Sequence, residues 1–215
     1  MTIIINWFEW ENRLTRFLMD QMAGADAAHN LDHIHRVVKT AKQLAEVEGA
    51  DPAVVIPAAW LHDCVTMSKD SGQRHRASHM AATAAGGFLR ASGYNPALIP
   101  AVEHAIAAHS FSAQIPPQTI EAKVVQDADR LDAIGAVGIA RCLMVGTAFG
   151  IPLYHPEEPF PQQRQPNDKQ YIIDHFYLKL FKLEGTMQTT AGRAEAAQRT
   201  QFMRDFLSQL GREIG

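Results

Sequence analysis

The stretch AAWLHDCVTM, residues 58–67, places a histidine and an aspartate side by side at the end of an apolar segment. Burying ionisable groups is costly unless they are paired or bind a metal, so His62 and Asp63 indicate a role beyond packing. Neighbouring side chains on a regular helix diverge by about 100°. The pair can therefore reach one common partner only near a helix end. The polar run Ser68–Gly72 predicts that the helix ends just before it.

The rest of the chain shows helical periodicity. Apolar side chains recur every three to four positions in residues 7–22, 31–49, 75–93, 94–109, 118–145, 169–183 and 191–210. Asp51 and Pro52 predict the N-cap and the first residue of the helix that leads into His62. No stretch alternates apolar and polar residues for long enough to build a sheet. The predicted fold class is therefore all-α, a helical bundle with a C-terminal helical extension.

Two further pairs of residues predict where helices begin. Asp32 is expected to cap the helix over 31–49, which leaves His29 in the loop before it. Asn95 and Pro96 predict the start of the helix over 94–109 in the same way. These assignments decide which histidines share a helix face.

The organisation of the chain favours one domain over residues 1–215. Its core is expected at about residues 20–150, followed by two final helices over 170–215. Residues 151–169 are rich in proline and polar side chains, which predicts a connecting loop rather than a domain boundary. Trp7, Trp10 and the aromatic run HFYLKLF are expected in the core or in a homodimer contact.

Composition excludes several classes of protein. The hydrophobic share is 47%, the net charge is -3, and two distant cysteines occur without CxxC spacing. A basic nucleic-acid footprint is absent, and the cysteines indicate a reducing compartment rather than a disulfide framework. The longest apolar region, 133–153, is interrupted by Arg141 and glycines, which predicts a buried helix rather than a membrane span. We therefore expect a cytoplasmic protein that does not enter a membrane.

Histidines and acids gather in a few segments of this chain. Ten histidines occur, among them His29, His33, His35, His62, His79, His104 and His109. The string QDADRLDA adds Asp127, Asp129 and Asp132. Imidazole and carboxylate ligands together suit a divalent cation such as manganese, iron, cobalt, nickel or zinc. Ligands from several helices can meet inside a helical bundle.

These motifs, taken in order, resemble the HD-domain metal-dependent phosphohydrolase superfamily. DHIHRV places the family's His-x-x-Arg-Val pattern on His33, Arg36 and Val37, AAWLHD places the doublet on His62 and Asp63, and QDADRL places the last aspartate on Asp129. The strings IAAHSFSAQ and VVQDADRLDAIGAVGIAR are similar to those of small stand-alone bacterial HD hydrolases. The second similarity continues through DHFYLKLFKL and so spans nearly the whole chain.

The resemblance implies one divalent ion (manganese, cobalt, nickel, iron, magnesium or zinc) held by four residues, His33, His62, Asp63 and Asp129. It also implies hydrolysis of a phosphate ester or anhydride in a small phosphorylated metabolite, with a nucleotide as the first expectation. Asp127 or Asp132 would hold or deprotonate the attacking water, and His109 would contact substrate or donate a proton. Lys69, Arg36 and Arg76 are the candidates for phosphate binding.

Several alternatives compete with this interpretation. His29 lies four residues before His33, which is ligand spacing on one helix face, although only His33 fits the family pattern. His79 and His104 could support a second metal and hence a two-iron oxygenase, a chemistry also found on this fold. A non-catalytic metal or nucleotide sensor is the third reading. Cys64, in apolar sequence, is interpreted as a small buried hydrophobe rather than a nucleophile.

Overall fold

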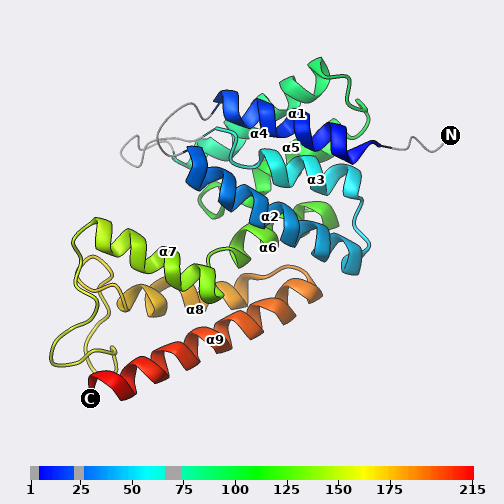
Figure 1. Cartoon of the computed structure of the whole chain (residues 1–215). Helices are drawn as coiled ribbons and strands as arrows, with labels where there is room; N and C mark the ends of the chain where they lie inside the picture. Colours follow the sequence, from blue (N-terminus) through cyan, green and yellow to red (C-terminus); the bar gives the residue numbers. More distant parts are fainter. Residues whose placement is uncertain (1–4, 22–26, 66–73) are drawn as a thin grey trace. The chain divides into compact units, whose positions relative to one another are not determined.

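The structure, a computed structural model, describes residues 5–21, 27–65 and 74–215. Its described residues contain no strand, and the all-α prediction is confirmed (Figure 1). The helices are α1 (Trp7–Gln21), α2 (Ala27–Glu48), α3 (Pro52–Leu61), α4 (Arg74–Ala91), α5 (Ile99–His109), α6 (Ile120–Leu131), α7 (Gly135–Ala148), α8 (Phe181–Leu183) and α9 (Thr190–Ile214). The 3₁₀ turns η1 (Phe111–Ala113) and η3 (Glu184–Thr186) and a π-helical segment η2 (Phe176–Leu180) complete them.

Helix α3 is the centre of the first part of the chain. It contacts α1, α2, α4 and α5, and all of its residues after Pro52 are buried. A helix that is apolar on every face belongs inside a protein, which explains why α3 shows no amphipathic stripe. The helix ends at Leu61, with His62 as its C-cap and Asp63 in the following turn. The predicted helix end at the doublet is therefore confirmed.

The start of α3 also agrees with the sequence. Asp51 is the N-cap, and its carboxylate accepts a hydrogen bond from the backbone N–H of Ala53 at 2.8 Å. Pro57 lies inside the helix, which nevertheless continues to Leu61.

Two other predicted helix starts are wrong. Helix α2 begins at Ala27, so Asp32 and His29 lie inside the helix rather than before it. Ala27 and Ala28 are strong helix formers, and they extend the helix beyond the predicted cap. Helix α5 begins at Ile99; Asn95 caps a preceding turn by accepting from the N–H of Ala97 at 3.1 Å.

The chain divides into two compact units, Met1–Asp129 and Arg130–Gly215. Whether they behave as the predicted single domain stays a prediction. In the second unit α7 packs on α9, and residues 151–169 form no helix. The buried Asp174 holds this loop by accepting two hydrogen bonds from Arg164, at 2.5 and 2.6 Å, and one from the backbone of Asn167.

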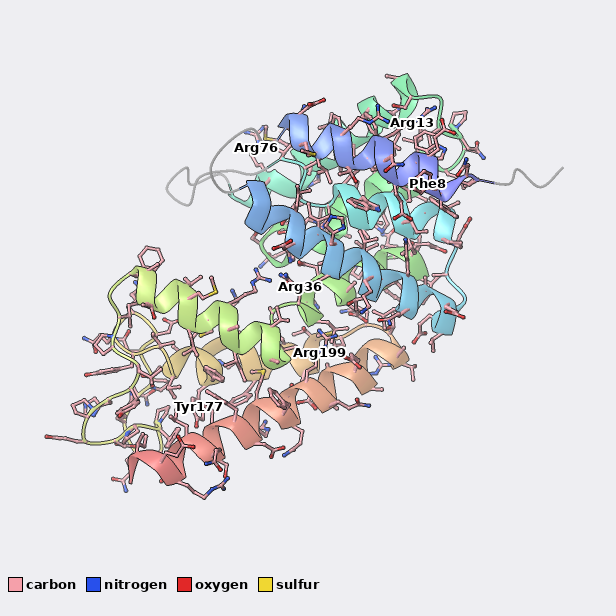
Figure 2. The ribbon with its side chains drawn as sticks, in the orientation of Figure 1. Phe8, Arg13, Arg36, Arg76, Tyr177 and Arg199 are labelled. Carbon is pink, nitrogen blue, oxygen red and sulfur yellow. The ribbon has the colours of Figure 1, made fainter. Side chains whose placement is uncertain are left out.

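The predicted helices of the second unit need two corrections. The helix expected over 169–183 is wound partly as the π-helical segment η2, where Tyr177 lies (Figure 2). Helix α7 is not buried on all sides, because Met144 and Val145 are 61% and 50% exposed. Within the described residues, a single helix long and apolar enough to cross a membrane is absent; by length and composition alone, the bent pair α6 and α7 passes that test.

Candidate metal centre

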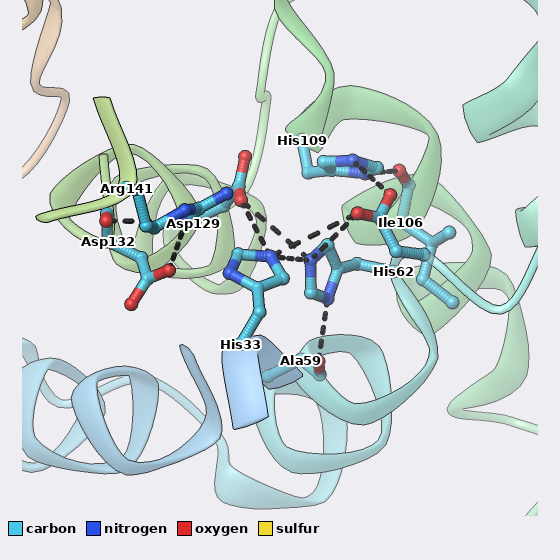
Figure 3. Close-up of polar contacts among 9 residues, drawn as sticks. His33, Ala59, His62, Ile106, His109, Asp129, Asp132 and Arg141 are labelled. Carbon is cyan, nitrogen blue, oxygen red and sulfur yellow. Dashed lines mark hydrogen bonds and ion pairs between the residues drawn. The ribbon is translucent and has the colours of Figure 1, made fainter. Parts of the chain in front are cut away.

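Four side chains from three places in the sequence come close together in the unit Met1–Asp129, and Figure 3 labels three of them, His33, His62 and Asp129. His33 lies on α2, His62 caps α3, Asp63 lies in the turn after it, and Asp129 lies on α6. Because the doublet lies at the helix end, both of its side chains reach the same place. His109, the last residue of α5, lies against this group.

The polar atoms of the four side chains are close together. The Nε2 atoms of His33 and His62 are 3.2 Å apart. Asp129 Oδ1 lies 3.4 Å from His33 Nε2 and 3.8 Å from His62 Nε2. Asp63 Oδ2 lies 3.7 Å from His62 Nε2 and 4.0 Å from His33 Nε2.

This spacing fits one small divalent cation. Imidazole nitrogens and carboxylate oxygens bind such an ion at about 2.0–2.2 Å, which puts neighbouring ligand atoms about 3 to 3.5 Å apart. One atom each from His33, His62 and Asp129 already lies within 4.8 Å of the others. Asp63 brings a second carboxylate, so the charge of the set balances a doubly charged ion.

The backbone selects the form of His62 that such a site requires. Its Nδ1–H donates to the Ala59 carbonyl at 2.8 Å, which leaves the Nε2 lone pair turned toward the other site residues. A hydrogen bond at one ring nitrogen commonly orients the other toward a metal. Burial lowers the pKa of the fully buried His62 below its ordinary value, despite the nearby carboxylate of Asp63. The neutral imidazole is therefore favoured.

The two carboxylates remain ionised for a different reason. Burial alone raises the pKa of Asp63, but its electrostatic interactions with the His62 and His109 rings and the hydrogen bond from His109 outweigh it and hold that pKa below the usual range. Burial also raises the pKa of Asp129, and the hydrogen bond from His33 with the electrostatic interactions of the neighbouring histidine rings reverses the direction. The site therefore presents two carboxylates in their ligand form.

The pKa of His109 shifts in the opposite direction to that of His62. Its Nδ1–H donates to the Ile106 carbonyl at 2.6 Å, and its Nε2 lies 3.5 Å from Asp63 Oδ1. Burial lowers the pKa of His109, but the Asp63 carboxylate raises it by more, so the net direction is upward. With Nδ1 already a donor, only the protonated ring can also donate from Nε2. His109 is thus suited to carry a proton at the site.

Comparison with known proteins agrees with this geometry. The HD domain model matches residues 30–134. The uncharacterized protein YpgQ of Bacillus subtilis is 35% identical over 201 residues, which cover 92% of this chain and 88% of YpgQ. The chain belongs to the HD domain family.

Solved structures extend the similarity over nearly the whole HD protein. An HD-superfamily hydrolase from Bacillus thuringiensis matches with a TM-score of 0.74 and 31% identity, covering 97% of this chain and 98% of that one. The crystal structure of B. subtilis YpgQ in complex with ADP matches with a TM-score of 0.72 and 31% identity, covering 97% of each chain. The expected resemblance to small bacterial HD hydrolases is confirmed.

The other predicted site residues of this HD protein lie in several places. Asp127 is fully buried on α6. Asp132 is buried in the unit Arg130–Gly215, where its carboxylate pairs with Arg141. From the sequence, Arg141 is only a charged residue that interrupts an apolar segment, so its ion pair with Asp132 was not predicted.

The candidate phosphate-binding residues are less completely defined. Figure 2 shows Arg36 on α2 and Arg76 near the start of α4. Arg76 is exposed and lines a cavity of about 560 Å³ with His79, Met80 and Thr83. Lys69 lies outside the described residues.

His104, His35 and Cys64 make contacts of the ordinary structural kind. His104 Nε2 accepts a hydrogen bond from the N–H of Gln118 at 3.1 Å, and His35 packs its ring edge against Trp60. The Cys64 thiol is buried and directed at the Ala81 carbonyl, and burial raises its pKa to about 12. A thiol of that pKa is inert near neutral pH.

Gln126 is a residue that the motif search did not single out. It lies inside the string QDADR, one helical turn before Asp129, and is buried with 3% of its surface exposed. Its Nε2 donates to the Ala108 carbonyl at 2.6 Å, next to His109 in the chain.

Proposed function

We propose that this HD protein is a divalent-metal-dependent phosphohydrolase that releases phosphate or pyrophosphate from a small phosphorylated metabolite, first of all a nucleotide. The observation that carries the proposal is that two imidazole nitrogens, from α2 and the α3 end, lie 3.2 Å apart and each lies 3.4–4.0 Å from a carboxylate oxygen of Asp63 and of Asp129. Membership of the HD family and the similarity to HD-superfamily hydrolases support it.

In this proposal His33, His62, Asp63 and Asp129 hold one ion. Such an ion supplies a water of lowered pKa and offsets the charge that develops on the phosphoryl group. The protein holds these ligands in place. The Ala59 carbonyl orients the His62 ring, and the end of α3 at Leu61 lets the side chains of His62 and Asp63 both reach the site.

His109 is proposed as the proton donor of the site. Its Nε2 lies beside the Asp63 carboxylate, and its ring is anchored through Nδ1 to Ile106. Protonated His109 can donate a hydrogen bond to a phosphoryl oxygen or a proton to the departing oxygen. Either role requires the ring to stay in place as substrate binds.

The residue that directs the attacking water is proposed to be Asp127 or Asp132. Asp127 is fully buried and lies two residues before Asp129 on α6. The Asp132 carboxylate instead accepts a hydrogen bond from Arg141. The variants Asp127→Asn and Asp132→Asn separate the two, since only the residue that acts on water should lower kcat when its charge is removed. Arg36, Arg76 and Lys69 are proposed to neutralise substrate phosphate.

The nucleotide expectation is supported by a relative. YpgQ, matched over 97% of its chain, has been crystallised in complex with ADP. Adenine nucleotides are therefore the first substrates to test, with other nucleoside mono-, di- and triphosphates beside them.

The test is phosphate and pyrophosphate release from a nucleotide panel, using metal-stripped protein resupplied with manganese, cobalt, nickel or magnesium. We expect metal-dependent release, one ion per chain, and loss of both in His62→Ala. His35→Asn is the matched control: His35 lies on α2 two residues from His33 and packs against Trp60, so this variant should keep the ion and the activity.

Two other outcomes would contradict the hydrolase. Two irons per chain with no release would favour the oxygenase. One bound ion with no release from any nucleotide or other phosphorylated metabolite would favour the non-catalytic sensor.

A further inference from the structure

The end of α5 carries His109 and is held by a side chain from another helix. The last four carbonyls of an α-helix have no partner within that helix, and α5 ends at His109. One of these carbonyls, that of Ala108, accepts a hydrogen bond from Gln126 Nε2 at 2.6 Å. Ala108 is fully buried, so bulk water does not reach this residue in the folded protein.

The orientation of the Gln126 amide is determined by this contact. Only the NH₂ end of the amide can donate to a carbonyl, and a flipped amide would set two oxygens against each other. The other end, Oε1, is buried without a hydrogen-bond partner among the described residues. The Ala108 contact is thus what fixes this side chain.

The contact joins two turns that both carry site residues. Gln126 and Asp129 are three residues apart on α6 and so share one face. Ala108 immediately precedes His109, whose own ring is anchored to Ile106 in the same turn of α5. A change at Gln126 therefore alters how the last turn of α5 is held against α6.

We propose that Gln126 is a positioning residue: by bonding the Ala108 carbonyl it keeps the His109 ring at its place beside Asp63, 3.5 Å from Nε2 to Oδ1. In this proposal Gln126 acts on the site through His109. The role of His109 in turnover rests on the proposed function; the placement of its ring does not.

The first test is spectroscopic and needs no substrate. In protein labelled with ¹⁵N-histidine, Gln126→Met removes the donor while keeping an unbranched chain of similar length. The expected result is a shift or exchange broadening of the His109 ring signals, which are assigned with His109→Asn. Unchanged His109 signals in folded Gln126→Met would overturn the proposal, whatever the protein hydrolyses.

A matched control separates positioning from general loss of stability. Val102 lies on α5, fully buried and away from its end, so Val102→Ala weakens the same helix without touching the Ala108 carbonyl. It should lower the melting temperature but leave the His109 signals in place. If Gln126→Met does not fold, Gln126→Glu, nearly identical in shape, replaces the donor by an acceptor and is read in the same way.

The second test is kinetic. With a substrate found for the wild type, Gln126→Met should lower kcat about 10- to 100-fold, as loss of a supporting hydrogen bond does elsewhere, while KM changes little and the ion count stays at one. An unchanged kcat would contradict the proposal. A wild type without any hydrolysis would instead contradict the proposed function and leave the spectroscopic test to decide the role of Gln126.

Discussion

At the scale of single residues, three neighbours in the chain have three different environments. His62 is fully buried and favoured as the neutral ring, Asp63 keeps 46% of its side chain exposed, and Cys64 turns into the core toward Ala81. The helix end between Leu61 and Cys64 causes this divergence, because each residue after it points in a new direction. A doublet in mid-helix could not do the same.

The Cys64 thiol should react slowly with thiol-specific reagents in the native protein. Burial, and then the negative charge of Asp63, raise its pKa to about 12, so at pH 8 about one thiol in ten thousand is ionised, against about a quarter at the ordinary pKa of about 8.5. Because only the thiolate reacts, labelling of the native protein with a chromogenic disulfide should leave Cys64 unmodified over hours and should speed up as the pH rises.

The same reagent in guanidinium chloride should label both cysteines at once. Rapid modification of Cys64 in the native protein at pH 8 would contradict the buried position of its side chain.

At the scale of elements, α3 is the part on which the site depends. Its N-terminus is held by Asp51 and by the Tyr94 hydroxyl, which donates to the Ala53 carbonyl at 2.5 Å. Its C-terminus carries the metal-site doublet.

Removing the cap should therefore destabilise the protein measurably. Asp51→Ala deletes the acceptor for the Ala53 N–H, a loss of about 1 kcal/mol for a helix N-cap, and should lower Tm by about 2–4 °C in a chain of this size. Asp51→Ser, which can still accept that bond, should restore most of the loss. Equal Tm values for Asp51→Ala and the wild type, measured by circular dichroism, would show that the cap does not stabilise α3.

At the scale of the whole molecule, the relatives match this chain over both of its units. The HD match covers residues 30–134, yet YpgQ and the B. thuringiensis hydrolase match over nearly all of this chain, including Arg130–Gly215. The unit Arg130–Gly215 has stabilising contacts of its own, among them the ion pair between Arg164 and the fully buried Asp174. The similarity to these relatives therefore extends beyond the metal-site motifs to both units.

Ion binding should stabilise the folded chain by mass action. A ligand that binds only the folded state at 100 times its Kd stabilises it by about 2.7 kcal/mol, which corresponds to about 5–10 °C in Tm here. Manganese or cobalt added to metal-stripped protein should produce this rise. Asp63→Asn, which keeps the shape of the side chain and removes its charge, should abolish most of it.

The His35→Asn protein serves as the control and should show the full rise. A similar rise in Asp63→Asn would mean that the stabilising ion binds somewhere other than beside the doublet.

The sequence by itself determined the all-α fold and the position of the doublet at a helix end, because helical periodicity and helix-ending residues are local properties of the chain. Through its resemblance to the HD family it also predicted His33, His62, Asp63 and Asp129 as the metal ligands, which stays a prediction. It misplaced the starts of α2 and α5, where good helix formers and a capped turn overrode the expected caps.

Only the tertiary structure decided which side chains meet. The pairing of Asp132 with Arg141, the engagement of His104 by Gln118, the approach of His109 to Asp63 and the bond from Gln126 to Ala108 join residues from 9 to 46 positions apart. Such contacts depend on how helices pack side by side, and packing is set by the summed burial of many side chains rather than by any short string of sequence.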